Sequence, residues 1–165
     1  MKKTIFLSLA VILAGTLILT GCGEEKVAEK AIESSTGGQA DVDVDDDTVT
    51  VNTNGSSFTA GEAVSLPSGF PSDVYVIDGT IKAATTVTEG EVYSVSIQTD
   101  TSVSDAADEY QEELANDGWE VNMTLNAGGV SSMTAQKDNR TVTISIGQDE
   151  DENKTLVTIG TSTDQ

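Results

Sequence analysis

The sequence predicts an α+β domain made of a mostly antiparallel β-sheet with one main amphipathic helix packed on it. Three observations carry this prediction. Valine and isoleucine alternate with threonine and serine in several short segments, which is the period of a strand with one buried face. One segment, residues 102–119, repeats its apolar residues at helical spacing. Short connections rich in Gly, Asn and Asp favour antiparallel neighbours. The predicted order is an N-terminal β-meander followed by ββ-α-ββββ.

The N-terminal meander is predicted in residues 40–61, ADVDVDDDTVTVNTNGSSFTAG. Val42 and Val44 alternate with aspartates, so the valines are expected to face the core and the aspartates to face solvent. Valines alternate with threonines in the next segment. The turns between the three strands are expected at Asp45-Asp46-Asp47 and at Asn54-Gly55.

Residues 62–99 are predicted to cross the surface once and then form a hairpin. Both prolines lie in LPSGFP, which should therefore run extended, with Leu66 and Phe70 turned inward. Residues 73–77 are expected to form a short strand. The hairpin pairs residues 80–87 with 91–99 around Glu89-Gly90.

The helix has recognisable ends as well as an apolar side. Ser102 is a favourable N-cap with Asp105 three residues later, and Gly118 stops the helix. Trp119 is expected to pack beneath it, the alternative being a surface anchor for a partner. The apolar side of the helix consists of Val103, Ala106, Ala107, Tyr110 and Leu114, and four further strands are predicted at 119–125, 130–136, 141–146 and 155–161.

The amino terminus carries an export signal. Lys2 and Lys3 precede an apolar stretch over residues 5–19, which is short for a stable membrane span. The stretch ends in Leu19-Thr20-Gly21-Cys22, which resembles the lipobox of bacterial lipoproteins. The resemblance implies that the Cys22 thiol is linked to a diacylglyceryl group, that the chain is cut before Cys22, and that the new amino group is open to acylation. The expected division is a signal peptide at 1–21, a flexible lipid-anchored tether at 22–39 and a single acidic α+β domain at 40–165.

A second resemblance covers most of the remaining chain. The tether EKAIESSTGGQADVDV, the segment LPSGFPSDVYV and the helix-to-tryptophan junction SVSDAADEYQEELANDGWEV together look like a group of uncharacterised, membrane-anchored bacterial lipoproteins. This resemblance implies export and a shared fold. It implies no catalytic activity.

The charge and the residue inventory exclude several kinds of function. Without residues 1–21 the chain keeps six basic and 28 acidic residues, a net charge of about −22, which repels nucleic acid and other copies of the chain. We therefore expect a monomer that binds no nucleic acid. The sequence contains no histidine, so Ser-His and Cys-His catalytic pairs and histidine zinc sites are absent. Cys22 has no second cysteine with which to form a disulfide.

Two chemical alternatives remain open. Asp43, Asp45 and Asp47 have the alternate spacing of the first ligands in a calcium loop, although Asp46 and Asn52 occupy the places where an EF-hand needs glycine and glutamate. They are weak candidates for a divalent-cation site. A carboxylate-based hydrolase is the other alternative, and it requires two carboxylates converging in a cleft.

The expected function is therefore that of a membrane-anchored, extracytoplasmic lipoprotein. It acts as a non-enzymatic binding or cell-envelope accessory module, with no cofactor. Its expected partners are the membrane, through the lipid on Cys22, and an envelope protein. Its expected location is the cell membrane, on the side that faces out of the cytoplasm.

Overall fold

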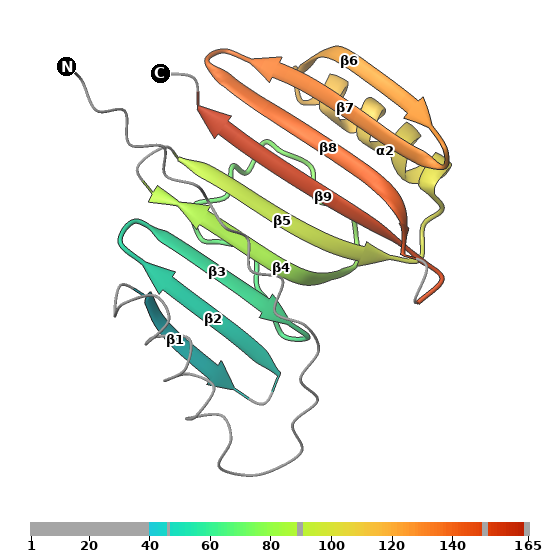
Figure 1. Cartoon of the computed structure of the whole chain (residues 1–165). Helices are drawn as coiled ribbons and strands as arrows, with labels where there is room; N and C mark the ends of the chain where they lie inside the picture. Colours follow the sequence, from blue (N-terminus) through green and yellow to red (C-terminus); the bar gives the residue numbers. More distant parts are fainter. Residues whose placement is uncertain (1–39, 46, 89–90, 150–151, 164–165) are drawn as a thin grey trace, which may run out of the picture.

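A computed structural model describes residues 40–45, 47–88, 91–149 and 152–163 (Figure 1). These residues form a nine-stranded antiparallel sheet and one long helix, so the prediction of a mostly antiparallel β-sheet with one helix is confirmed. The signal peptide, the lipobox and the tether lie outside the described residues. The elements are β1 Ala40–Asp45, β2 Thr48–Thr53, β3 Ser56–Gly61, β4 Thr80–Val87, β5 Val92–Thr99, α2 Val103–Asn116, β6 Glu120–Ala127, β7 Val130–Lys137, β8 Arg140–Asp149 and β9 Lys154–Thr163.

At one place in the sheet, neighbouring strands are not consecutive in the sequence. Strands β1 to β5 are neighbours in sequence order, but β5 then pairs with β9, and the sheet ends β9-β8-β7-β6. The chain therefore leaves β5 through α2, reaches the far edge at β6, and returns strand by strand to β5. The helix lies behind β6 and β7 in the view of Figure 1 and contacts β6, β7 and β8. We call the face of the sheet that α2 covers the inner face, and the opposite face the outer face.

The hydrophobic core lies between the inner face and α2. Alternate residues of the central strands point to this face and are fully buried, as their period of two requires. The helix contributes Ala106, Tyr110 and Leu114, one turn apart from each other. The strand side of the core consists of Ala84, Val95, Ile97, Met133, Ala135, Val142, Ile144, Ile146, Val157 and Ile159.

The ends of α2 agree with the expected capping residues. The Asp105 amide donates to the Ser102 hydroxyl at 3.2 Å, which satisfies one of the free N–H groups of the first turn. At the other end the Trp119 and Gly118 amides donate to the carbonyls of Leu114 and Ala115 at 2.8 and 3.1 Å. Gly118 has a φ of +80°, so the ending is a Schellman motif with glycine at the left-handed position.

The segment between β3 and β4 differs from its prediction. Residues 73–77 form no strand, because local turns use their backbone groups: the Phe70 amide donates to the Pro67 carbonyl at 2.9 Å and the Val74 amide to the Pro71 carbonyl at 3.2 Å. Phe70 is buried as predicted, but Leu66 is 41% exposed, so its predicted inward orientation is wrong. The segment packs Phe70, Val74 and Ile77 into the core.

The first three strands present their apolar residues to the outer face. Cross-strand partners share a face, and the register runs from core residue Ala84 through Thr59 and Thr50 to Asp43. The polar side chains of β1–β3 therefore share the face on which the core lies. Val42 and Val44 lie on the opposite face, so the prediction that they face the core is wrong. The alternation is present as predicted, but the face to which the valines point depends on the register between β3 and β4.

Candidate functional site

A groove of about 870 Å³ lies at one end of the helix layer, and we call it the α2 groove. Three parts of the chain form its walls: the start of α2, the tip of the β6–β7 hairpin, and the turn between β8 and β9. Side chains of both polarities line it. The lining residues are Asp100, Ser102, Val103, Ser104, Ala107, Asp108, Asn126, Ala127, Gly128, Gly129, Val130, Gln148, Asn153, Lys154 and Thr155.

The hairpin wall is shaped by two glycines. Gly128 and Gly129 have φ values of +60° and +82°, the left-handed conformation that a two-residue hairpin turn requires. No heavy atom lies within 4 Å of the position that a Cβ atom would occupy at either residue. The turn therefore stands clear of the helix, which leaves open space between the hairpin tip and the first turns of α2.

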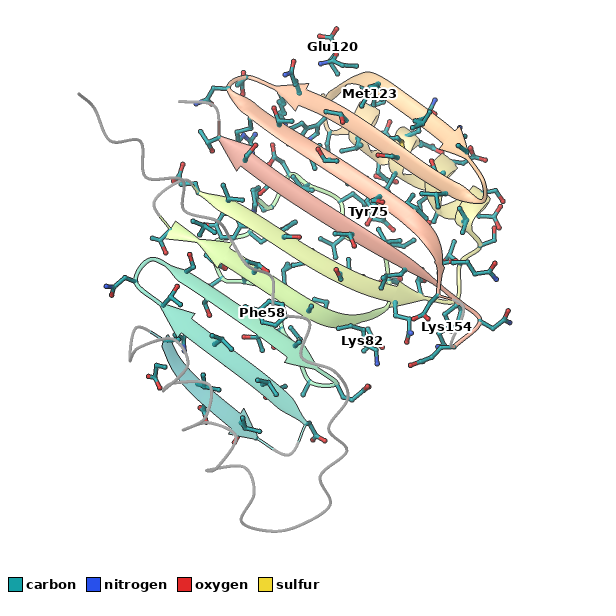
Figure 2. The ribbon with its side chains drawn as sticks, in the orientation of Figure 1. Phe58, Tyr75, Lys82, Glu120, Met123 and Lys154 are labelled. Carbon is teal, nitrogen blue, oxygen red and sulfur yellow. The ribbon has the colours of Figure 1, made fainter. Side chains whose placement is uncertain are left out.

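The polar groups of the groove carry a net negative charge. Asp100 and Asp108 contribute carboxylates, and Lys154 contributes the one cation among the lining residues. The Lys154 Nζ atom lies 3.2 Å from Asp100 Oδ1, while the Asp100 side chain is 88% exposed. Figure 2 shows Lys154 where β9 begins, beside the end of β5. A ligand in the groove thus meets solvated carboxylates at its mouth and the apolar side chains of Val103 and Ala107 on the helix.

A second cluster fixes the segment before β4 to the end of the helix layer, and we call it the Asp73 clamp. Arg140 donates to both Asp73 carboxylate oxygens at 2.7 Å, and Lys137 donates to Asp73 Oδ2 at 2.8 Å. The Trp119 indole N–H donates to the Asp73 carbonyl at 2.8 Å. Both cations lie over the Trp119 ring, Arg140 at 5.1 Å and Lys137 at 5.8 Å from its centroid. Trp119 is buried, which excludes the alternative of a surface anchor.

The Asp73 clamp has an electrostatic signature. Hydrogen bonding to Arg140 holds the pKa of Asp73 well below its usual range, and the same bond raises the pKa of Arg140. Every charged group in the clamp is paired with an opposite charge. The cluster is therefore best explained as a structural link between residues 73–77 and the β7–β8 turn.

Two tyrosines connect the same segment to α2. The Tyr75 hydroxyl donates to the Glu109 carboxylate, and its ring meets the edge of Tyr110 at a centroid distance of 5.3 Å. The buried Tyr110 hydroxyl accepts a hydrogen bond from the Ile77 amide at 3.3 Å. Burial raises the pKa of both phenols. Both hydroxyls stay protonated at physiological pH and serve packing.

The weak metal candidates do not converge. Asp43 and Asp45 lie on the edge strand β1, and Asp47 lies in the turn that follows. Asp47 uses its carbonyl to accept a bond from the Glu62 amide at 2.9 Å. Among the residues that the structure describes, no group of three or more acidic, cysteine or histidine side chains can hold a metal ion.

Asp100 of the α2 groove lies in a solvated environment, unlike the protonated carboxyl group of a carboxylate hydrolase. Such an enzyme needs one carboxyl group kept protonated by an apolar environment and a second that stays ionised. Asp100 is solvated and paired with Lys154, so it lacks the required apolar environment. The groove combines charged and hydrogen-bonding side chains with a small apolar wall.

The comparison with protein families points to the same part of the chain. Residues 81–162 are similar to a family model described as START domain-like. The match begins in β4, ends in β9, and includes α2 and every residue of the α2 groove. The observed arrangement, a mostly antiparallel sheet with one helix, is consistent with a START-like α+β fold. Searches of curated proteins and of solved structures gave no significant match.

Sequence reasoning identified the walls of this site but not the site. The Ser102 cap was predicted from the sequence and borders the α2 groove, and so does Gly128-Gly129, a short glycine-rich connection of the kind that favours antiparallel neighbours. No nearby sequence pattern marks three further lining residues, Asp100, Asp108 and Lys154, as part of a site. They come together because β5 pairs with β9, a contact between residues more than 50 positions apart. The predicted lipidation site, Cys22 with Leu19, Thr20 and Gly21, lies outside the described residues.

Proposed function

We propose that the chain is a membrane-anchored, extracytoplasmic lipoprotein whose domain is a non-enzymatic module that binds a small ligand in the α2 groove. The lipobox-like Leu19-Thr20-Gly21-Cys22 supports the anchor. A diacylated cysteine adds roughly 0.8 kcal/mol of membrane affinity for each buried methylene, and two chains make the attachment stable. Among the described residues, no helix is long and apolar enough to span a bilayer.

The observation that carries the binding proposal is the position of the α2 groove. The groove lies wholly within the residues that are similar to a START domain-like family, a possible ligand-binding fold. It is bordered by the ends of elements, where side chains can vary without disturbing the sheet ladders. The core beneath α2 is filled by Tyr110, Met133 and Ile146, so the ligand is expected at the end of the helix layer and not within the core.

The lining chemistry suggests a small amphiphile with a cationic or hydrogen-bond-donating head. Asp100 and Asp108 would receive the head, and Val103 and Ala107 would contact its apolar part. An anionic head is disfavoured, because the groove has more negative than positive groups and the whole chain carries a large negative charge.

The proposal is tested by filling the groove. The substitution Ala107→Trp places a large ring on the helix wall, and Ala115→Trp places the same ring on an exposed helix position outside the groove. Both variants and the wild-type chain are purified from membranes and analysed by native mass spectrometry for retained small molecules. We expect a bound molecule with wild type and with Ala115→Trp, and none with Ala107→Trp. Equal retention by all three proteins would exclude the α2 groove as the binding site.

A further inference from the structure

Strand β6 forms one border of the sheet, opposite β1 (Figure 1). Among the described residues β6 pairs only with β7, and seven of its eight residues are exposed. The pairing is irregular at first, because the register shifts between Val121 and Met123, and a bulge of this kind discourages further strands from pairing. Residues 123–127 then pair regularly with β7. We call these five residues the β6 edge.

The β6 edge lacks the side chains that usually keep a border strand from pairing with another chain. Charged residues and proline serve this purpose in many sheets. The opposite border, β1, carries Asp41, Asp43 and Asp45 within six residues. Residues 121–136, which include the β6 edge and most of β7, contain neither a charged residue nor a proline, although the chain has 28 acidic residues. Of the two borders, β1 is therefore protected by its charges and the β6 edge is not.

Exposed apolar side chains gather at this border of the sheet. They lie on the outer face, because Thr124, between two of them, pairs with the core residue Met133. Three of them are 56%, 60% and 47% exposed, more than any other large apolar side chain among the described residues. Figure 2 shows the first of them, Met123, at the β6 border. Adjacent apolar side chains on an unpaired strand indicate contact with another polypeptide. The four side chains are Met123, Leu125, Val130 and the smaller Ala127.

The backbone of the β6 edge presents hydrogen-bonding groups at two of its residues. The turn at Gly128-Gly129 has two residues, so the flanking pair Ala127–Val130 is hydrogen-bonded, and every second pair along the hairpin repeats this arrangement. Thr124 and Asn126 belong to the intervening pairs. Their amide and carbonyl groups therefore point away from β7 toward the open border, and a strand that pairs here must align with these two residues.

We propose that the β6 edge pairs with the β6 edge of a second copy of the chain, around a two-fold axis at Leu125. In this register Thr124 of each copy lies opposite Asn126 of the other, so each of these pairs exchanges both of its backbone hydrogen bonds. On the outer face Met123 of each copy meets Ala127 of the other, and the two Leu125 side chains meet at the axis. One register thus satisfies the backbone groups and covers the apolar side chains.

Other registers fit less well. A shift of one residue would place the free groups of one copy opposite groups of the other that already face β7. A shift of two residues would bring either Asn122 of the bulge or Gly128 of the turn into the ladder. The β6 edge is therefore complementary to itself in a single register, which is the property that an interface with two-fold symmetry requires.

The net charge of the chain opposes self-association, and on that ground the sequence predicts a monomer. The charges lie away from the proposed contact, however. The aspartates of β1 are eight strand spacings, roughly 38 Å, from the β6 edge, and Glu120 precedes the bulge and lies outside the five-residue ladder. Salt screens charges beyond about 8 Å at physiological ionic strength. A basic partner, in contrast, would be attracted to the acidic surfaces and not to the uncharged residues 121–136.

The pairing is weak in solution and is favoured on a membrane. The β6 edge is roughly 17 Å long, so it buries much less than the roughly 800 Å² per partner of a standard interface. Chains that are anchored to one membrane are confined to its surface, which raises their effective concentration. The contribution of the membrane rests on the proposed lipidation, whereas the register of the pairing does not.

The register is tested by disulfide formation in the full chain on its native membrane. Leu125→Cys places two thiols across the axis in a non-hydrogen-bonded pair, whose Cα atoms are about 4.5 Å apart, within the range of a disulfide. Met123→Cys is the matched control on the same strand and face, because its two copies would be roughly 14 Å apart. After mild oxidation we expect a disulfide-linked dimer with Leu125→Cys and at least tenfold less with Met123→Cys. Equal yields, no dimer with Leu125→Cys, or its linkage to a different protein would overturn the proposal.

The wild-type chain separates this result from the proposed lipidation. Its one cysteine is Cys22, so a disulfide-linked dimer of wild type would count against a lipid on that thiol. The β6 register would then be read from Leu125→Cys and Met123→Cys in chains that also carry Cys22→Ser, with the same expected and contradicting results.

Sedimentation velocity of the full chain in detergent gives an independent measurement. Leu125→Lys places two like charges at the axis and should reduce the dimer at least tenfold, whereas Ser132→Lys, at the partner of Leu125 on β7, should retain it. Because like charges oppose the pairing, raising the salt concentration from about 0.05 to about 0.5 M should increase the dimer fraction several-fold in wild type. A dimer fraction that falls with salt, or that is lost equally in both variants, would contradict the proposal.

Discussion

Replacing Asp73 by asparagine should cost more stability than any other single carboxylate substitution on the surface of the domain. The Asp73 clamp contains three charge-assisted hydrogen bonds of 2.7–2.8 Å, and its side chains are about one-third exposed. Hydrogen bonds to charged groups contribute roughly 1.5–3 kcal/mol when buried, and exposed ion pairs less than about 1 kcal/mol. For this partly exposed, bidentate arrangement we expect the free energy of unfolding to fall by about 2 kcal/mol.

The effect has a predicted pH dependence. Hydrogen bonding to Arg140 lowers the pKa of Asp73 in the folded state, so the unfolded chain takes up its proton first as the pH falls. The stabilisation from Asp73 is therefore complete above about pH 5 and is lost as the pH falls below about 4, the pKa of an unperturbed aspartate. The difference in stability between wild type and Asp73→Asn should be largest at neutral pH and should shrink toward pH 2.

The assay is urea denaturation, because urea, unlike guanidinium, does not screen charges. Glu112→Gln, on the exposed side of α2, is the matched control and should change stability by less than about 0.5 kcal/mol. A decrease of about 2 kcal/mol corresponds to a fall in Tm of roughly 8 °C for a domain of this size. The reasoning is refuted if Asp73→Asn behaves like Glu112→Gln at pH 7, or if the difference between Asp73→Asn and wild type is the same at pH 7 and pH 2.

Three further predictions concern single positions. The buried Ser131 hydroxyl has no hydrogen-bond partner among the described residues, so Ser131→Ala should leave stability unchanged or raise it by up to about 1 kcal/mol in the same urea assay, and a clear loss would show that the hydroxyl is bonded. Gly118→Ala should lower the free energy of unfolding by about 1 kcal/mol. The positive φ alone causes this loss, because no atom lies within 4 Å of the added Cβ. Gly118→Asn should lower it less, because asparagine tolerates the left-handed conformation better. Cys22→Ala should abolish the incorporation of labelled palmitate, and the variant protein should no longer be found in the membrane fraction. Labelling that persists in the variant would refute the proposed lipidation site.

The helix and the strands were predictable because capping residues and hydrophobic periodicity lie within each element's own sequence. The cap at Ser102 and the stop at Gly118 set the ends of α2, and the period-two segments located the strands to within a few residues. The prediction of a strand at residues 73–77 is wrong, although the consecutive β-branched and aromatic residues Val74 to Ile77 are typical of strands. The turns at Pro67 and Pro71 occupy the nearby backbone groups, and Tyr110 takes the Ile77 amide, so no strand ladder forms.

The contacts that form the α2 groove and that decide which face of β1–β3 is apolar join residues far apart in the sequence. Pairing of β5 with β9 brings Asp100 close to Lys154. No sequence pattern near either residue predicts this contact. The alternation in β1–β3 does not state which face is buried: a period of two predicts that one face is apolar, and only the register with β4 reveals that it is the outer face. Both features required the strand order.

The central claim is that the α2 groove binds a small amphiphile with a cationic head. The most direct measurement is a thermal-shift titration of the purified full chain with hexylammonium, hexanol and hexanoate, in wild type, Ala107→Trp and Ala115→Trp. We predict that Tm rises most with hexylammonium and least with hexanoate, and that Ala107→Trp removes the rise while Ala115→Trp keeps it. A rise that is equal for all three compounds, or that survives in Ala107→Trp, would contradict the assignment of ligand binding to the α2 groove.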